Sequence, residues 1–424
     1  MEIIENSKVK EKIYIDKAEN GLTIMVIPKE NFQKKYVIFG THYGSLDNEF
    51  IMPITEEHVK IPDGVAHFLE HKMFEQENGT NSLDVLSALG VEANAYTTND
   101  HTAYLFEATE KFYEALDELM DYVQKPYFTY DNVEKEKGII GQEIRMYDDH
   151  PGWQAYMNAM KCMYKNNPIK IDIAGTVESI SKIDKDVLYK CYNTFYHPSN
   201  MSIVLCGDFV PEDIIKEVKK RLINKGTQTE IKRIYPEESE EISNNEITSN
   251  MDVSNPLFAI GIKDVKPDTK NIVKKHIAIQ ILLELIIGES SSLYQELYNQ
   301  GKILSVPNLD YEFSNQYAHI LITGQSREPK YIYEQINNQI EKMKEEGIDH
   351  EEFDRIKKKI YGGYITEYNS ISNIARNVLE DYFKGINGFD YIEQYPLIST
   401  EYVQQILKDV FKKEKMVLSI VEGK

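Results

Sequence analysis

The sequence has few cysteines, and those it has are scattered. Its 424 residues include three, at positions 162, 191 and 206. An odd number without short spacings forms neither a disulfide framework nor a cysteine-type zinc site. We therefore expect simple thiols in a reducing compartment. Residues 1–12 are polar and charged, without the apolar core of a signal peptide, so a cytoplasmic location is predicted.

Basic side chains are outnumbered by acidic ones, and long apolar runs are scarce. The chain carries 48 lysine and arginine residues against 69 acidic residues, which gives a formal net charge of −21. A field of this sign repels nucleic-acid phosphates and anionic membrane surfaces, although acidity can also serve solubility alone. No apolar run approaches the roughly 18–20 residues that span a bilayer. We expect neither a nucleic-acid partner nor a membrane, whereas cationic peptides remain compatible ligands.

The same order of predicted strands and helices occurs twice along the chain. In the first half, two strands (22–28 and 36–43) are followed by a helix (63–79), a short helix (82–89) and a hairpin (91–108). Three further helices (111–124, 131–147 and 185–195) and a last strand (201–206) complete this half. The second half repeats this plan at 257–262, 269–287, 292 onward, 308–323, 331–346, 351–381, 400–411 and 416–421. The pattern predicts an α+β protein with two similar domains, each an antiparallel-rich sheet covered by helices. We assign 1–225 to the first domain, 226–250 to a polar linker and 251–424 to the second domain.

The most informative helix carries two histidines and a glutamate. His67 and His71 are four residues apart, so they lie on one face with Cβ atoms about 5–6 Å apart and can share one zinc ion. Glu70 can reach a metal-activated water without binding the metal itself. This His-x-x-Glu-His order is the inverse of the commoner His-Glu-x-x-His motif. The alternative is two surface histidines on an amphipathic helix, since short motifs also occur by chance.

A later helix offers the third protein ligand that a catalytic zinc requires. Glu136 and Glu143 are seven residues apart and therefore lie on one face, two turns apart. One of them can bind the metal while the other orients a histidine from outside. The residues alone leave open which glutamate has which role.

These motifs resemble those of the pitrilysin/insulinase family of zinc peptidases, the inverzincins. The chain is most similar to the branch of mitochondrial processing peptidase and to the zinc-bearing member of bacterial paired peptidases. The resemblance covers nearly the whole chain. Its motifs are HFLEH at 67–71, EKEKGIIGQE at 134–143, HYGS at 42–45, ANAYT at 93–97, FYHP at 195–198 and SSLY at 291–294.

The resemblance implies a role for each site residue. His67, His71 and Glu143 match the ligands of one Zn²⁺ per chain, and Glu70 matches the catalytic base. Glu136 matches a supporting carboxylate.

The resemblance also implies how a substrate binds. Asn94 and Ala95 fall on the edge strand that takes the peptide substrate as an added strand in this family. His101, which follows the same strand, has no paired motif and is expected to be structural.

The family further implies a zinc-dependent endopeptidase that hydrolyses peptides or unfolded segments inside a closed chamber. Two domains form half of the clamshell that single-chain relatives build from four. Active members carry an arginine and a tyrosine in the later half, and the matching positions here hold Tyr298 and about Leu304. We therefore expect a related partner chain to supply the Arg-Tyr pair in a heterodimer, with a homodimer as the alternative, and a role in peptide processing.

Two other interpretations remain open. The chain could be a non-catalytic scaffold or peptide-binding subunit of the same fold, although such relatives typically lose the zinc motif. It could also be a metal-binding peptide receptor that cleaves poorly because the Arg-Tyr pair is absent.

Overall fold

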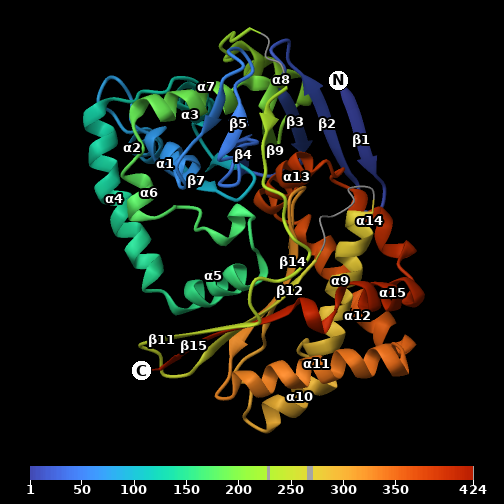
Figure 1. Ribbon diagram of the computed structural model, residues 1–424. Coiled ribbons are helices and arrows are strands. Elements are labelled where there is room, and N and C mark those ends of the chain that lie inside the picture. Colours follow the sequence, from blue (N-terminus) through green and yellow to red (C-terminus); the bar gives the residue numbers. More distant parts are fainter. Residues whose placement is uncertain (227–229, 265–270, 424) are drawn as a thin grey trace. The chain divides into compact units, whose positions relative to one another are not determined.

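The computed structural model describes residues 1–226, 230–264 and 271–423, which form two compact units (Figure 1). Unit 1 consists of Met1–Ile144, Asp172–Tyr235 and Thr366–Phe389, and unit 2 of Arg145–Ile171, Pro236–Ile365 and Asp390–Lys424. One point where the chain passes from unit 1 to unit 2, between Tyr235 and Pro236, lies inside the predicted linker 226–250. Residues 145–171 belong to unit 2, although they were assigned to the first domain, and residues 366–389 belong to unit 1, although they were assigned to the second domain. The compact units therefore differ from the predicted domains in these two segments.

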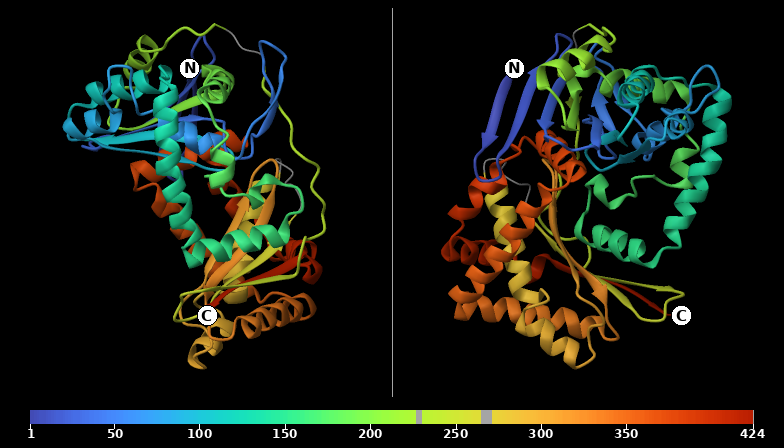
Figure 2. Two further views of the ribbon diagram at one scale, coloured as in Figure 1. Left: turned by 60° about the vertical axis from the view of Figure 1, so that its left-hand side comes forward. Right: turned by 180° about the vertical axis from the view of Figure 1, so that it is seen from behind.

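Unit 1 is built on a β-sheet (Figure 2). Its seven strands lie in the order β1-β2-β3-β9-β4-β8-β7. Within it β3 and β9 are parallel, and the other neighbours are antiparallel. The strands are β1 Glu2–Asn6, β2 Glu11–Lys17, β3 Thr23–Pro28, β4 Lys35–Thr41, β7 Glu92–Thr97, β8 Thr102–Ala108 and β9 Met201–Gly207. A small sheet of β5 (Glu49–Ile51), β6 (His58–Lys60) and β10 (Lys232–Arg233) adjoins it. The central strands β4 and β9 are buried along almost their whole length because helices cover both faces.

The helices of unit 1 lie on opposite faces of this sheet. One face carries the main hydrophobic core, where side chains of α1, α3 and α7 meet alternate residues of the strands, such as Val37 and Phe39. The other face is covered by α13, which packs on β4 and β9. The helices are α1 Val65–Lys72, α2 Ser82–Ala88, α3 Phe112–Gln124, α4 Tyr130–Asp148, α6 Val177–Ile180, α7 Lys185–Phe195, α8 Pro211–Lys220 and α13 Ile371–Lys384, of which α4 continues into unit 2.

Unit 2 repeats this plan with a five-stranded sheet in the order β11-β15-β12-β14-β13. Its strands are β11 Glu246–Met251, β12 Leu257–Lys263, β13 Asn308–Phe313, β14 Ala318–Gln325 and β15 Met416–Gly423. As in β3-β9-β4-β8-β7, the first pair is parallel and the rest are antiparallel. Its helices are α5 Pro151–Met163, α9 Ile272–Ile287, α10 Ser292–Asn299, α11 Pro329–Glu346, α12 His350–Glu367, α14 Asp390–Gln394 and α15 Thr400–Val410. The predicted α+β class with two similar halves is confirmed.

One helical stretch in unit 2, Ile272–Asn299, is long and apolar enough to cross a membrane by composition alone. Of its most apolar window, 72% is buried inside the protein, which is what the core helix of a globular domain also shows. It comprises α9 and α10, and the chain turns between them at Gly288, the C-cap of α9. The stretch is therefore explained by packing within unit 2.

The two halves exchange one helix each. Helix α5, from the first half of the sequence, packs on β12 and β15 of unit 2, whereas α13, from the second half, packs on β4 and β9 of unit 1. A glycine on the receiving strand permits each close approach. A Cβ atom at Gly40 would lie 2.8 Å from Leu379 Cδ2 of α13, and one at Gly261 would lie 2.8 Å from Met163 Sδ of α5.

The single helix predicted over 351–381 is wrong, because the chain breaks between α12 and α13. Ser370 caps the new helix by accepting a hydrogen bond from the backbone N–H of Asn373. Helix α5 was not predicted from the sequence. Its start is marked by His150, which accepts a hydrogen bond from the N–H of Trp153, and by Pro151 in the first turn.

Candidate metal centre

Helix α1 places the predicted histidines, and it is shorter than expected. It begins after Gly64, whose φ of +94° suits glycine and whose added Cβ would lie 2.5 Å from the carbonyl oxygen of Ala174. It ends at Lys72, with Met73 as C-cap, so the predicted end near residue 79 is wrong. The chain then turns back through an isolated bridge between Glu75 and Asn81.

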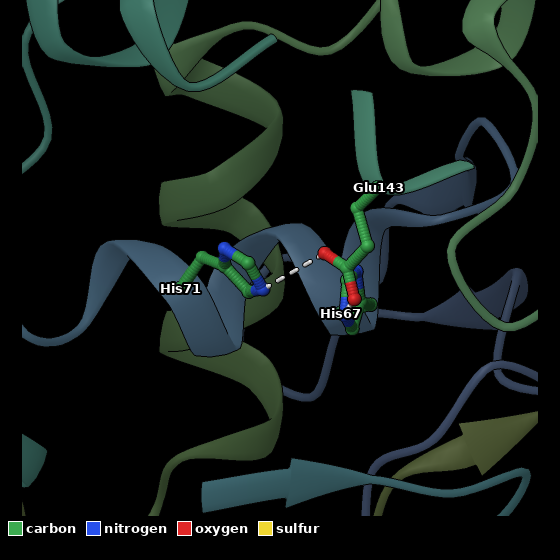
Figure 3. Close-up of side chains that lie close together, drawn as sticks. All are labelled: His67, His71 and Glu143. Carbon is green, nitrogen blue, oxygen red and sulfur yellow. Dashed lines mark ion pairs between the residues drawn. The ribbon is translucent and has the colours of Figure 1, made fainter. Parts of the chain in front are cut away.

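The structure brings three of the predicted residues together at one point (Figure 3). His67 Nε2 lies 3.7 Å from Glu143 Oε1, and His71 Nε2 lies 3.5 Å from Glu143 Oε2. One ligand atom from each residue lies within 4.8 Å of the other two. Zinc bonds of about 2.0–2.2 Å in a tetrahedral site separate ligand atoms by roughly 3.3–3.5 Å. The three side chains therefore fit a single ion with small adjustments.

The protonation state of His67 suits metal binding. Burial, with the neighbouring His71, lowers the pKa of His67 to about 3, so its imidazole is neutral at ordinary pH. Neutral imidazole is the form that binds a metal. Its Nδ1 is buried and has no hydrogen-bond partner among the described residues, so its polar contact is left to Nε2, which faces Glu143.

Glu136 holds His71 from the side away from Glu143. Its Oε1 lies 3.1 Å from His71 Nδ1, and its Oε2 accepts a bond of 3.2 Å from Lys72 Nζ. Burial lowers the pKa of His71, but the bond to Glu136 and the charges of Glu70 and Glu143 outweigh it and hold this pKa above its usual value. Burial raises the pKa of Glu136, but His71 and Lys72 outweigh it and keep the carboxyl ionised. Such a carboxylate–histidine pair leaves Nε2 as the ligand atom.

Glu70 is buried beside the three candidate ligands and is held by a threonine. Thr97 Oγ1 donates a hydrogen bond of 2.8 Å to Glu70 Oε2. Burial raises the pKa of Glu70, an effect that the bond from Thr97 and the charge of His71 partly offset. A carboxylate with a raised pKa is better matched to proton transfer near neutral pH. No role was predicted for Thr97, although this residue ends the strand that contains Asn94 and Ala95.

Asn94 and Ala95 lie on β7, the last strand of the seven-stranded sheet. They pair with Leu105 and Tyr104 of β8, and within the described sheet β7 has no neighbour on its other side. The Ala95 N–H donates to the side-chain oxygen of the preceding Asn94. An edge of this kind is the type of site that accepts a peptide as an added strand.

His101 follows the hairpin turn and is buried. Its Nδ1 lies 2.6 Å from Asp100 Oδ1, and its Nε2 lies 3.4 Å from the hydroxyl of Tyr96. The structure groups it with these residues and not with the three candidate ligands, and its structural role stays a prediction.

Comparison with known proteins assigns both halves of the chain to one peptidase family. Residues 57–177 match the family model described as Insulinase (Peptidase family M16), and residues 182–360 match the model described as Peptidase M16 inactive domain. The chain is 40% identical over 425 residues to the uncharacterized zinc protease YmfH of Bacillus subtilis, covering 99% of each chain. The chain belongs to peptidase family M16, and the resemblance to the insulinase family is confirmed.

Solved structures share the fold over the full length. An M16-like protein from Alicyclobacillus acidocaldarius matches with a TM-score of 0.94 at 33% identity, covering 99% of this chain and 100% of the other. The periplasmic protease PqqL of Escherichia coli matches with a TM-score of 0.75 at 18% identity, covering 99% of this chain but 48% of its own. The present chain thus corresponds in fold to about half of that protein.

Proposed function

We propose that this chain is a zinc-dependent endopeptidase and the metal-bearing member of a two-chain enzyme. The observation that carries the proposal is the convergence of His67, His71 and Glu143, with ligand atoms within 4.8 Å of one another, beside the buried Glu70. These three side chains would hold one Zn²⁺. A zinc ion in such a site lowers the pKa of water to about 7 and polarises a peptide carbonyl.

In this proposal the other residues bind the substrate and move protons. Glu70 accepts the proton of the attacking water and passes it to the departing amine, while Thr97 keeps the carboxylate in place. The edge of β7, at Asn94 and Ala95, binds the peptide main chain. Glu136 keeps His71 oriented.

We further propose that a related second chain supplies the arginine and tyrosine expected of an active member. Tyr298, at one of the matching positions, is an exposed residue of α10, and Leu304, at about the other, is aliphatic. The length supports the same view, because the chain matches 48% of the PqqL chain. A cytoplasmic location agrees with three free, buried cysteines.

The test is zinc content together with cleavage of a quenched peptide library. The chain is assayed alone and mixed with a candidate partner, a related chain of similar length from the same genome. We expect bound zinc in the chain alone and cleavage in the mixture. Cleavage by the chain alone would contradict the need for a partner, and absence of zinc would contradict the metal site.

A non-catalytic subunit is the second candidate, since residues 182–360 match a model described as an inactive domain. Bound zinc with no turnover in any combination would favour this candidate over the peptidase.

A further inference from the structure

Lys72 is a buried charge that the proposed mechanism does not use. It follows His71 directly, and its side chain is 0% exposed. Its Nζ lies 2.8 Å from Glu75 Oε2 and 3.2 Å from Glu136 Oε2. Removing a lysine from water is costly unless it is paired, and an apolar residue would avoid that cost. A lysine at this position therefore needs a reason beyond packing.

Glu136 connects Lys72 to the metal site. One of its oxygens contacts His71 Nδ1 at 3.1 Å, and the other contacts Lys72 Nζ at 3.2 Å. With a partner on each oxygen, the carboxylate has one preferred rotation about its terminal bond. That rotation directs Oε1 at the imidazole, places the ring hydrogen on Nδ1 and leaves Nε2 facing Glu143.

The balance of charge around the site also indicates a role for Lys72. Four carboxylates, those of Glu70, Glu75, Glu136 and Glu143, surround His71 and Lys72. A divalent ion would balance two of these charges, and Lys72 is the cation that touches Glu136. Without Lys72, Oε2 of Glu136 would lose its cationic partner, and the carboxylate would be free to turn away from His71.

We propose that Lys72 is a positioning residue for the zinc ligand His71 and acts through Glu136. This inference rests on the proposed zinc site. Glu75 has a lesser role in it, because its side chain is 30% exposed and, among the described residues, it forms an ion pair with Lys72 but with neither histidine. Glu75→Gln is therefore the matched control, since it removes the other ion-pair partner of the same lysine.

The test is a double-mutant cycle of Lys72→Met and Glu136→Gln. Zinc affinity is measured by chelator competition, and ¹⁵N-histidine NMR of the zinc-free protein, recorded at a pH above the raised pKa of His71 so that its ring is neutral, reports which His71 nitrogen carries the hydrogen. Loss of a group that orients a ligand costs about 10- to 100-fold in metal affinity. We expect K72M to lie in the lower part of that range and to mix the His71 tautomers. E75Q should change the affinity less than about threefold, and K72M should add no further loss to E136Q.

An unchanged zinc affinity in K72M, or an equal loss in the wild-type and E136Q backgrounds, would overturn the inference. Should K72M alone not fold, E136Q is compared with K72M/E136Q, which leaves no unpaired carboxylate at residue 136. A further loss beyond about threefold overturns the inference, and equal affinities exclude any route from Lys72 to the metal other than residue 136. Absence of zinc from the wild-type chain would instead contradict the proposed function, while the tautomer of His71 decides the role of Lys72 separately.

Discussion

The two units place very different helices at the same point of one topology. Helix α1 is the first helix after β4, and α9 is the first after β12, and the two strands hold equivalent places in matching sheets. Helix α1 has eight residues and buries Glu70 and Lys72, whereas α9 has 16 residues and buries eleven hydrophobic ones. The fold therefore needs a covering helix at this place but not its polar side chains.

The comparison also indicates what the polar helix costs. Burying carboxylates and a lysine requires hydrogen bonds and counter-charges that an apolar helix does without. In unit 1 those partners are Thr97 for Glu70 and Glu136 for Lys72. Unit 2 can build its core from isoleucine and leucine. Variants in α1 and in the two sheets sharpen this comparison.

The largest effect is expected from Glu70→Gln. Loss of a general base typically costs about 10²- to 10⁴-fold in rate, and glutamine cannot accept the proton. Zinc content should not change, because Glu70 is not among the three candidate ligands. Turnover of the active combination and zinc per chain are measured together. Cleavage near the wild-type rate would remove Glu70 from the mechanism.

The second effect is expected from Glu143→Gln, which replaces an anionic ligand with a neutral amide. Zinc affinity should fall by more than about 100-fold, since even groups that only orient a ligand cost about 10- to 100-fold. Glu284→Gln on α9 is the matched control. That residue pairs with Lys359 in unit 2, and its loss should not affect zinc. An unchanged affinity in E143Q would point to Glu136 as the third ligand.

The sequence could predict this site because its signals are local. Residues four and seven apart on helices define the ligand faces, and the family resemblance decides between Glu136 and Glu143. Lys72 was not predicted, because a lysine on a short helix normally extends into solvent and nothing in its spacing reveals a buried partner 64 residues away.

The exchange of α5 and α13 could not be predicted either. Periodicity indicates which face of a helix is apolar, but not which sheet that face covers. The boundary between α12 and α13 contains neither proline nor glycine, and its one signal is the capping Ser370. Strands β1 and β2 were missed because their sequences are short and rich in charged residues.

The exchange of α5 and α13 leads to a third prediction, which compares the sheets of units 1 and 2. Gly40→Ala and Gly261→Ala each place a methyl group 2.8 Å from the exchanged helix, at Leu379 and Met163. Overpacking of this kind costs about 1–3 kcal/mol of unfolding free energy. Denaturant unfolding of both variants measures it, with Gly138→Ala as control because an added Cβ there meets no atom within 4 Å. A neutral effect of G40A would show that α13 can move away from β4.

The smallest expected effect is an acid sensitivity of unit 1. Burial and the charge of Arg233 lower the pKa of His42 to about 4, and its ring stacks on Phe383 of α13 with centroids 5.2 Å apart. Because the unfolded pKa is about 6.5, the unfolded chain binds more protons between pH 6.5 and 4. This contribution to stability is present above pH 6.5 and is lost as the pH falls.

At pH 5.5 the loss from His42 should reach about 1 kcal/mol relative to pH 7.5. His42→Phe keeps a ring against Phe383 but cannot titrate. Urea unfolding of the zinc-free wild type and variant at both pH values measures the contribution of His42 to stability, because His67 titrates equally in each protein. If both proteins lose the same stability on acidification, protonation of His42 is not coupled to the packing of α13, and the acid sensitivity arises from other groups, such as the buried His67.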